Sequence, residues 1–381
     1  QVHGQAVARI EAGQRAAVAL AGVDRERLAR GDVLVTDAAW QSTTLATARL
    51  RVLRSAPPLR ARQRIRFHLG AAEVLGRVAL IEGREIAPGE EAWVQLRLEA
   101  PIVARAGDRF VIRSYSPVTT IGGGRIAEVA PARRKRLAPE DARSLGLFLD
   151  GAPADAVRAL VDGAGWAGFD LARLPVATPC APEAVRAAVA ALEAAGVVTR
   201  IGARLFRSAD LDHARTVLLD AVDRHHAQRP IEPGIPHEEL RRALPPRCPS
   251  ALADAVLAGL LGDGTLRTVP GGMLARAGFA PALSAEQRAV AEQIVALIGS
   301  AGLTPPLIGE LPPPLRDHPD LRAILRFLER EAQLVPLSGD LYIAPGALRD
   351  AVGVIRRQVP ADRALTPAEF KEILGISRKY L

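Results

Sequence analysis

The sequence predicts a multidomain chain in which β-structure comes first and helices follow, and three observations support this. The chain has 381 residues, which is more than one ordinary hydrophobic core accommodates. Up to residue 130 the apolar residues alternate in short runs, as they do in β-strands. After residue 137 their period is helical and the composition becomes rich in Ala and Leu. We therefore expect β-barrels or a β-sandwich, followed by small helical domains.

Seven short alternating runs, separated by turn residues, make up the predicted β-region. They lie at 15–20, 32–36, 47–53, 62–69, 73–80, 92–98 and 109–113. Pro57 and Pro58 interrupt the series and predict a boundary between two barrels, at 1–56 and 57–130. The glycine run 122–124 predicts a tight corner, because glycine adopts a positive φ without steric cost. The charged stretch 131–137 is typical of a basic linker between domains.

The helical part contains a weak internal repeat. Leu192, Leu260 and Leu328 are 68 residues apart, and each ends an apolar helix that precedes a small-residue turn and a short β-like pair. Helices followed by a two-stranded wing, repeated in this way, describe tandem winged-helix domains. We expect these domains at 138–208, 209–280 and 281–345, and the start of a fourth at 346–381.

The sequence contains no recognisable catalytic or metal-binding constellation. Cys180 and Cys248 are far apart and have no companion ligands, which argues against a disulfide framework and a zinc site and indicates a reducing cytoplasm. There is no phosphate-binding loop of the form GxxxxGKS/T, and the neighbours His225 and His226 are expected at a solvated helix end. No stretch approaches the length of about 18 apolar residues that a transmembrane helix needs.

Positive charge is concentrated in the first third of the chain. Residues 1–137 contain 23 Lys and Arg against 13 Asp and Glu, a net charge of +10, whereas the remaining residues contain 27 against 29. Binding to a polyanion such as nucleic acid requires a concentrated basic surface of this kind. The first third is therefore where we expect a nucleic-acid contact.

One predicted strand carries part of this charge as a stripe. Because side chains on a strand alternate between its faces, basic residues at every second position of 60–69 would share one face. That face would carry Arg60, Arg62, Arg64, Arg66 and His68, and the opposite face would point Ile65, Phe67 and Leu69 into the barrel. A nucleic-acid contact is one interpretation of the stripe, and an edge strand kept soluble by charge is the other.

The helices that precede the wings differ in charge, and so do their expected partners. The helix at 181–195 has one arginine and two glutamates, and the helix at 249–261 has a single aspartate. Winged helices that bind nucleic acid use basic helices, so we interpret units one to three, poor in positive charge, as spacers or protein contacts. Only the fourth unit, with Lys371, Arg378, Lys379 and Tyr380, combines basic and aromatic side chains as an RNA contact does.

Several segments resemble the selenocysteine-specific translation elongation factors of bacteria. They are VHGQAVARIEAGQRAAVALAGVDRERLARGDVL, RIRFHLGAAEVLGRVALI and PGEEAWVQLRLEAPIVARAGDRFVIRSYSPVTTIGGGRI, followed by RRKR. The GQR…RGDVL and GDRFVIR…IGGG elements are shared with relatives of elongation factor Tu, whereas VHG, SYSPVTTIGGG and the tandem winged helices are more specific. The final LTPAEFKEILGISRKYL is similar to the start of that family's last winged-helix domain. The resemblance is strong to residue 136 and thin from there to residue 345.

This resemblance implies a fold and a function. The fold is that of translation-factor β-barrels, one partial (1–56) and one complete (57–130), followed by tandem winged helices. The family is a GTPase that carries selenocysteyl-tRNA to ribosomes paused at a recoded UGA codon, where its last winged helix binds an mRNA hairpin. Arg15 of the GQR element would line the aminoacyl pocket, because a guanidinium pairs with a selenolate or holds a phosphate or carbonyl oxygen. The tRNA would contact Arg62, Arg64, Arg66, His68 and Arg113, and the mRNA would contact Ser377, Arg378, Lys379 and Tyr380.

The resemblance also implies what this chain lacks. The GTPase domain and the opening strands of the second domain are missing, so we expect no bound GTP, Mg²⁺ or other metal and no catalytic activity, although the full-length parent would use both GTP and Mg²⁺. The expected partners are selenocysteyl-tRNA, the mRNA hairpin and the ribosome, without a membrane, for a cytoplasmic monomer.

Two alternatives remain. One is a general translational GTPase relative without selenocysteine specificity, which the appended winged helices disfavour. The other is a winged-helix regulator that binds nucleic acid, which the low positive charge of units one to three disfavours.

Overall fold

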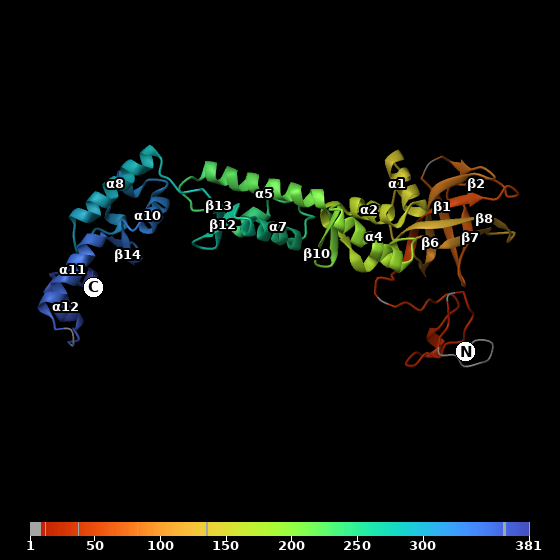
Figure 1. Ribbon diagram of the computed structural model, residues 1–381, viewed down its shortest axis with the longest axis horizontal. Coiled ribbons are helices and arrows are strands. Elements are labelled where there is room, and N and C mark those ends of the chain that lie inside the picture. The colour runs from red at the N-terminus through yellow and green to blue at the C-terminus, as the bar shows by residue number, and fades with distance from the viewer. Residues whose placement is uncertain are drawn as a thin grey trace. The chain divides into compact units, whose positions relative to one another are not determined.

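The computed structural model describes residues 9–11, 13–36, 38–81, 83–134, 136–360 and 363–380. The chain divides into two compact units, Gln1–Asp210 and Leu211–Leu381. The first contains a β-barrel and a winged helix, and the second contains two winged helices and a further pair of helices (Figure 1). Among the described residues, no helix combines the length and the apolar composition needed to cross a bilayer.

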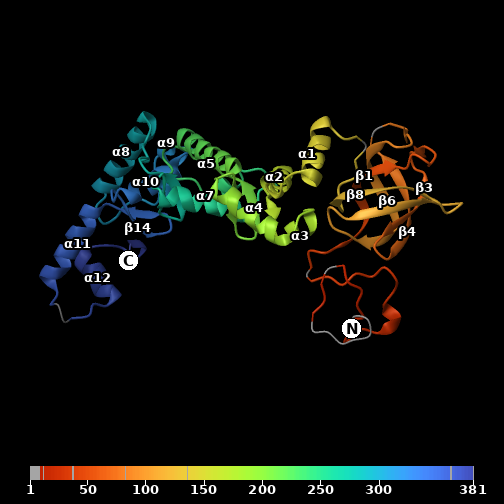
Figure 2. The same cartoon turned by 45° about the vertical axis from the view of Figure 1, so that its right-hand side comes forward.

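Six antiparallel strands close into a barrel in the first unit (Figure 2). Their order around the barrel is β1 (Ser42–Val52), β6 (Glu91–Val103), β4 (Ala72–Leu80), β3 (Arg64–Leu69), β7 (Arg109–Ser114) and β8 (Thr120–Val129). A separate two-stranded sheet consists of β2 (Leu59–Arg60) and β5 (Glu85–Ile86). Closure leaves no unpaired sheet edge in the barrel.

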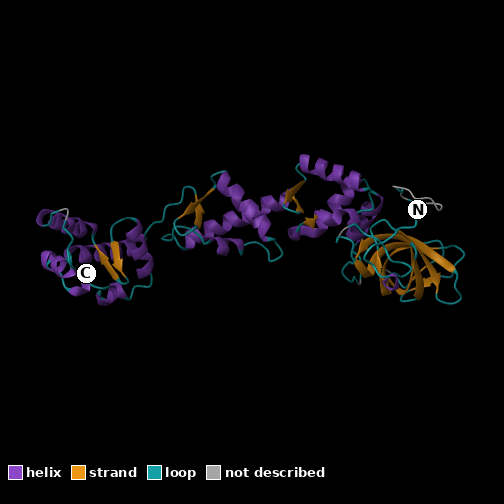
Figure 3. Cartoon of the chain, turned by 90° about the horizontal axis from the view of Figure 1, so that it is seen from below, coloured by secondary structure: helices purple, strands orange, loops and turns teal. Residues whose placement is uncertain are grey.

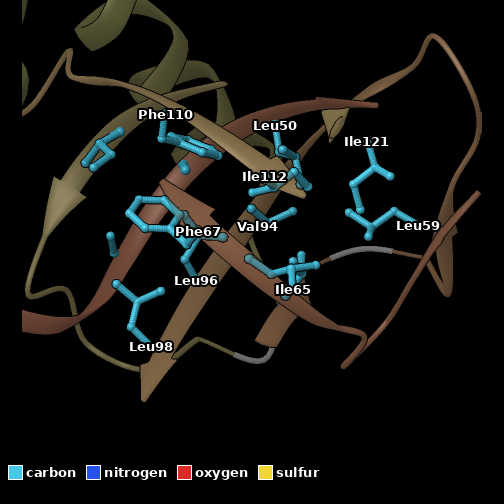
Figure 4. Packing of buried hydrophobic residues seen from close by; sticks show 14 of the residues in the cluster. Leu50, Leu59, Ile65, Phe67, Val94, Leu96, Leu98, Phe110, Ile112 and Ile121 are labelled. Atoms are coloured by element: carbon cyan, nitrogen blue, oxygen red, sulfur yellow. The ribbon is translucent and has the colours of Figure 1, made fainter. Parts of the chain in front are cut away.

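The barrel core is filled by the side chains that the alternating pattern assigns to the interior. In β3, Ile65 and Phe67 are fully buried, as predicted, and Leu96 and Ile112 reach the same core from β6 and β7 (Figure 4). The rings of Phe67 and Phe110 lie 5.1 Å apart between their centroids. The outward-facing residues of these strands are consequently the ones available to a partner.

The barrel begins earlier in the chain than predicted. Strand β1 precedes the two prolines and pairs with both β6 and β8, so the predicted boundary between 56 and 57 falls inside the barrel. The runs 15–20 and 32–36 form no strand, and the described part of 13–36 contains only one short helix, η1 (Arg25–Arg27). Alternation alone does not make a strand, because extended backbone must also find a pairing partner. The described residues before β1 therefore form no barrel of their own.

The glycine run 122–124 lies inside strand β8, not at a corner as predicted. A Cβ added to Gly123 would lie 2.6 Å from the carbonyl oxygen of Phe110, and one added to Gly124 would lie 2.0 Å from that of Arg49. Neither glycine has a positive φ. Close approach of the neighbouring backbones, and not backbone conformation, is thus what requires glycine here.

The first winged helix follows the barrel. Its elements are α1 (Pro139–Asp150), α2 (Pro153–Ala164), η2 (Gly165–Ala167), β9 (Phe169–Asp170), η3 (Leu171–Arg173), α3 (Leu174–Ala177), α4 (Pro182–Ala194), β10 (Val198–Ile201) and β11 (Arg204–Arg207). Strands β10 and β11 form the wing, and β9 joins them in a three-stranded sheet. Val157, Val185, Leu192 and Leu205 are buried in the core of this domain.

The second unit repeats the order of helices followed by a two-stranded wing (Figure 3). The second winged helix consists of α5 (Ser208–Gln228), which spans the division between the units, α6 (His237–Arg241), α7 (Ser250–Gly262), β12 (Leu266–Val269) and β13 (Met273–Arg276). The third consists of α8 (Ala285–Ser300), η4 (Ile308–Glu310), α9 (Pro313–Arg316), α10 (Leu321–Arg330), β14 (Val335–Ser338) and β15 (Leu341–Ile343). Helices α11 (Pro345–Gln358) and α12 (Pro367–Leu374) and the short η5 (Arg378–Tyr380) follow. The repeated leucines 192, 260 and 328 are all buried in the last helix before each wing, which confirms the repeat.

The two adjacent histidines of α5 are buried, so the prediction of a solvated helix end is wrong. His225 and His226 are only 5% and 8% exposed. The ring of His226 stacks on Phe279 with 3.5 Å between centroids, and its Nε2 accepts a hydrogen bond from the backbone N–H of Arg276 at 3.2 Å. Both residues do lie in the last turn of α5, as predicted, but packing against Phe279, in the segment after the wing, covers the ring of His226.

Candidate nucleic-acid interface

The predicted basic stripe is real but shorter than expected. Strand β3 presents Arg64, Arg66 and His68 on the face opposite the buried Ile65 and Phe67. The other two members of the predicted stripe leave this line. Residue 60 belongs to β2, and residue 62 sits in a turn with a left-handed φ of 64°. A residue in this conformation interrupts the extended backbone, so the side chains before it do not continue the alternation of β3.

Neighbouring strands extend the basic surface sideways. Arg64 lies directly opposite Arg77 of β4, Arg77 lies opposite Arg97 of β6, and Arg66 lies opposite Arg113 of β7. Directly opposed residues of antiparallel strands share one face of the sheet. These five arginines, on four adjacent strands, are referred to below as the arginine face. Arg77 and Arg97 were not among the predicted site residues, although each alternates with apolar neighbours within a predicted strand.

Two members of the arginine face are paired with carboxylates. Arg64 binds Glu99 through two hydrogen bonds of 2.9 and 2.7 Å, and Arg66 donates to Glu73 at 2.7 Å. Hydrogen bonds from these guanidinium groups hold the pKa of each glutamate below its ordinary value. Both carboxylates are consequently ionised at neutral pH and compete with any anionic partner for these two arginines.

The other three members have no carboxylate partner among the described residues. Arg77 donates to the backbone oxygen of Arg62 at 3.1 Å, and Arg97 and Arg113 are exposed. Their charges are held near one another by the strand register alone. Fixed positive charge without a bonded carboxylate attracts a phosphodiester backbone, although Glu99 lies within electrostatic reach of Arg77 and Glu73 within reach of Arg113.

An exposed aromatic ring borders the arginine face. Tyr115, in the loop between β7 and β8, is 45% exposed. The guanidinium carbons of Arg64 and Arg66 lie 4.7 and 5.6 Å from the centroid of its ring. Stacked rings and guanidinium planes are the groups with which proteins hold RNA bases and phosphates. Tyr115 lies in the segment that resembles the family, but it was not among the residues predicted to contact RNA.

His68 contributes a different feature to this face. The side chain is half-buried, and its Nε2 atom has no hydrogen-bond partner among the described residues. It lies opposite Glu73 on β4 and Val111 on β7. The ring therefore lies at the margin of the arginine face.

The structure does not place Arg15 in a pocket. The residue is exposed and lies outside any helix or strand. The segment 13–36 also exposes the apolar side chains of Val18 and Leu34. The role assigned to Arg15 by resemblance therefore stays a prediction.

The predicted mRNA-binding residues lie at or beside η5. Ser377 is exposed, and the side chain of Arg378 lies outside the described residues. Lys379 donates to both carboxylate oxygens of Glu310 in the third winged helix, at 2.9 and 2.8 Å. Its ammonium also lies 5.4 Å from the centroid of the Tyr380 ring. Lys379 is thus paired with a carboxylate, which would compete with an anionic partner for its ammonium.

The helix that precedes the third wing is more basic than predicted. Helix α10 carries Arg322, Arg326 and Arg330, spaced four residues apart, which places them on one side of the helix. They line a cavity of about 690 Å³, and Arg330 donates to the backbone oxygen of Ile231 at 2.9 Å. The prediction of low positive charge holds for α4 and α7 and is wrong for α10. In the described part of the chain, no group of three His, Cys, Asp or Glu side chains is placed to hold a metal ion.

Comparison with known proteins places this combination of a closed barrel and tandem winged helices among the translation elongation factors. Residues 47–133 match the family model described as the β-barrel domain of selenocysteine-specific elongation factor, and residues 219–269 match the model described as the winged helix of elongation factor SelB. The chain belongs to the family of selenocysteine-specific elongation factors.

Individual relatives agree with this assignment. The selenocysteine-specific elongation factor of Desulfomicrobium baculatum is 26% identical over 395 residues, covering 100% of this chain and 60% of the relative. That of Escherichia coli K12 is 26% identical over 374 residues, covering 97% of this chain and 57% of the relative. The crystal structure of a bacterial selenocysteine-specific elongation factor, EF-Sec, is 14% identical and has a TM-score of 0.52, covering 94% of this chain and 53% of that one, which supports the fold. The chain thus spans about 60% of the length of the curated relatives.

Proposed function

We propose that this chain binds selenocysteyl-tRNA on the arginine face of its barrel and takes part in delivering it to ribosomes at recoded UGA codons. The observation that carries the proposal is the strand register, which gathers the five arginines on one face of the barrel. Arg77, Arg97 and Arg113 form no ion pair with a carboxylate among the described residues. Family membership supplies the identity of the RNA. The geometry is suited to a folded RNA, because positive charge spread over four strands matches a phosphate backbone and not a single base.

The tandem winged helices after the barrel, referred to as the winged-helix arm, have a second role in this proposal. The residues at η5, Ser377, Arg378, Lys379 and Tyr380, would contact an mRNA hairpin through basic and aromatic groups. Two weak contacts on one ribonucleoprotein particle become a strong one when a single chain links them, because the second contact forms at a high effective concentration. The arm would therefore favour delivery at messages that carry the hairpin.

Selenocysteine specificity would involve Arg15. In a protein that includes the remainder of the family's length, Arg15→Ala is expected to weaken binding of selenocysteyl-tRNA much more than binding of seryl-tRNA. A guanidinium distinguishes the two because a selenolate is charged and a hydroxyl is not. Equal losses for both tRNAs would remove Arg15 from the aminoacyl pocket.

The described residues do not fit a site for GTP and Mg²⁺. The chain has no GxxxxGKS/T sequence, and no acidic or histidine cluster among the described residues is arranged for a metal. No step of the proposed function is assigned to either group.

The proposal is tested by measuring the affinity of the chain for selenocysteyl-tRNA over a range of salt concentrations. The double variant Arg77→Ala, Arg97→Ala should bind more weakly and lower the salt slope by about one for each phosphate that is no longer neutralised. The matched control is Arg186→Ala, which removes an exposed arginine from α4, on the first winged helix. Equal effects of the double variant and the control, or an unchanged slope, would contradict a specific role for the arginine face.

A further inference from the structure

The stretch between the barrel and the first winged helix is predicted from the sequence to be a linker, but the structure fixes it to the barrel. Gln95 of β6 is fully buried, and both polar atoms of its side-chain amide form hydrogen bonds with this stretch. Its Nε2 donates to the backbone oxygen of Ala132 at 2.8 Å, and its Oε1 accepts from the backbone N–H of Arg134 at 3.0 Å. Arg134 also binds Glu128 of β8 through two hydrogen bonds, of 2.6 and 3.1 Å. A buried amide with both atoms paired in this way holds a segment in one place.

A second contact joins the end of α1 to the side of the barrel. Arg49 and Arg125 lie directly opposite each other on β1 and β8, which brings two like charges together. Asp150, the last residue of α1, accepts two hydrogen bonds from Arg49, at 2.6 and 3.1 Å, and one from Arg125 at 2.8 Å. Arg125 also donates to the backbone oxygen of Leu149 at 2.9 Å, at the end of the helix where a positive charge is favoured. The helix thus supplies the negative charge that this pair of arginines needs.

A third contact involves the loop between β6 and β7. The backbone N–H of Ala106 donates to the oxygen of Val176 in α3 at 2.9 Å. The guanidinium of Arg105 donates to the backbone oxygens of Thr178 and Cys180, at 2.9 and 2.8 Å. A Cβ added to the following Gly107 would lie 2.7 Å from Pro179, so the two loops approach as closely as their backbones allow.

Apolar side chains fill the space between these polar contacts. Leu145, Phe148 and Leu149 of α1 are buried against Ile81 and Ala127 of the barrel. The cluster is continuous with the side of the first winged helix, through the buried Ala156 of α2. Burial of this kind is non-directional, whereas the three polar contacts around it specify a single orientation.

We propose that the barrel and the first winged helix form one rigid body, whose orientation is fixed by the Gln95, Asp150 and Arg105 contacts. One contact alone would act as a pivot, but three contacts from different elements leave no axis of rotation. Any reorientation of the second and third winged helices relative to the arginine face must then take place after residue 207. The division of the chain into units after Asp210 agrees with this. The first winged helix is therefore an extension of the barrel and not a tethered module. This inference does not depend on the RNA that the barrel binds.

The inference is tested in the full chain by measuring one distance between two spin labels. The native cysteines are replaced (Cys180→Ser, Cys248→Ser), and labels are attached after Val111→Cys on the barrel and Ala187→Cys on α4, both at exposed positions. Double electron–electron resonance should give a single narrow distance distribution. A broad distribution or several distances in this protein would overturn the proposal.

Removing the contacts should release the winged helix. The double variant Asp150→Ala, Arg105→Ala is expected to lose the single narrow distance, while circular dichroism shows that both domains stay folded. The control Arg51→Ala removes an ion pair with Glu91 that lies within the barrel, and it should leave the distribution narrow. A distribution that stays narrow in the double variant would overturn the assignment of the coupling to these residues.

Hydrogen exchange provides a test that needs no variant. The backbone N–H of Arg134 is bonded to a buried side chain, so its exchange should be slow, like that of the barrel strands. Exchange of this N–H at the rate of an unstructured peptide would show that the linker is free and would overturn the proposal independently of any label.

Discussion

Arg77 and Arg97 lie directly opposite each other on β4 and β6, and among the described residues neither forms an ion pair with a carboxylate, Glu99 being bonded to Arg64 instead. Like charges in this position destabilise a sheet by roughly 0.2–1 kcal/mol. The barrel tolerates this repulsion although one polar substitution would remove it. An arrangement that is unfavourable in the free protein and favourable beside a polyanion is typical of a binding surface.

This relationship predicts that stability and RNA affinity change in opposite directions. Arg97→Gln should raise the free energy of unfolding of the barrel by a few tenths of a kcal/mol, because it removes the cross-strand repulsion. The same variant should bind tRNA more weakly. Urea unfolding and tRNA titration measure the two quantities, and a variant that loses both stability and affinity would show that Arg97 has a structural role instead.

The carboxylates on the arginine face are predicted to weaken RNA binding. Glu99→Gln should increase affinity for tRNA, because the Glu99 carboxylate is bonded to two nitrogens of Arg64, Nε and one Nη, and competes with a phosphate for them. Glu91→Gln is the matched control, since Glu91 pairs with Arg51 outside this face. Titration of labelled tRNA at low salt measures the difference, and equal affinities of the two variants would argue against competition at Arg64.

The glycines of β8 predict a specific loss of stability. Gly124→Ala should destabilise the barrel by about 1–3 kcal/mol or more, because the added methyl group meets the carbonyl oxygen of Arg49. Gly146→Ala in α1 provides the opposite case, since nothing lies within 4 Å of its added Cβ. That variant should stabilise α1 by about 0.5–1 kcal/mol, as replacement of glycine inside a helix does. Thermal or urea unfolding of the two variants checks both signs.

The second winged helix is predicted to lose stability in acid. Burial, and next the neighbouring His225, lower the pKa of His226 below its ordinary value of about 6.5. The unfolded chain therefore binds a proton at a higher pH than the folded chain. Stability is complete above about pH 6.5 and falls as the pH decreases from there towards the folded-state pKa.

The measurement is the free energy of unfolding of the second unit in urea, at about pH 7.5 and at pH values below 6.5. His226→Phe should flatten the acid-side dependence, since phenylalanine keeps the stacking on Phe279 and cannot take up a proton. A dependence that persists in His226→Phe would assign the effect to another group.

The pairing of Lys379 predicts a gain of function at the other end of the chain. Glu310→Gln should strengthen binding of an mRNA hairpin and steepen its salt slope by up to about 0.9, because it frees one cation for a phosphate. The stability of the third winged helix should change little, since an exposed ion pair contributes about 0–1 kcal/mol. Hairpin titrations of the wild type and Glu310→Gln check this, and identical slopes would show that Lys379 does not meet the RNA backbone.

The parts of the fold that follow from local periodicity could be predicted from the sequence. The strands around 47–53, 62–69 and 92–98 and the buried leucines at the repeat interval depend on the alternation or helical period of neighbouring residues, and both patterns are visible in one dimension. Strand β8 was missed because glycines hide its alternation. The runs before β1 were wrongly predicted to be strands, because a strand also needs a neighbouring strand to pair with, and the run itself does not show whether one is present.

The candidate site could be predicted only in part, for the same reason. Arg64 and Arg66 were found because they alternate along one strand. Arg77 and Arg97 join them through the register between strands, which the sequence does not display. Lys379 was predicted as an RNA contact from its charge and the neighbouring Tyr380, whereas its pairing with Glu310 spans 69 positions along the chain. Long-range pairing decides which charges are free, and periodicity carries no information about it.

The double hydrogen bond of Gln95 also sets a length. The Gln95 side chain donates to the backbone oxygen of Ala132 and accepts from the backbone N–H of Arg134. Both bonds form only while these two backbone groups are two residues apart. Connections between domains ordinarily tolerate insertions, because their backbone groups face water. Insertion of a single residue after Ala132 would leave one side of a fully buried amide unpaired, at a cost of about 1–3 kcal/mol. The length of this connection is therefore more strongly constrained than the residue types within it.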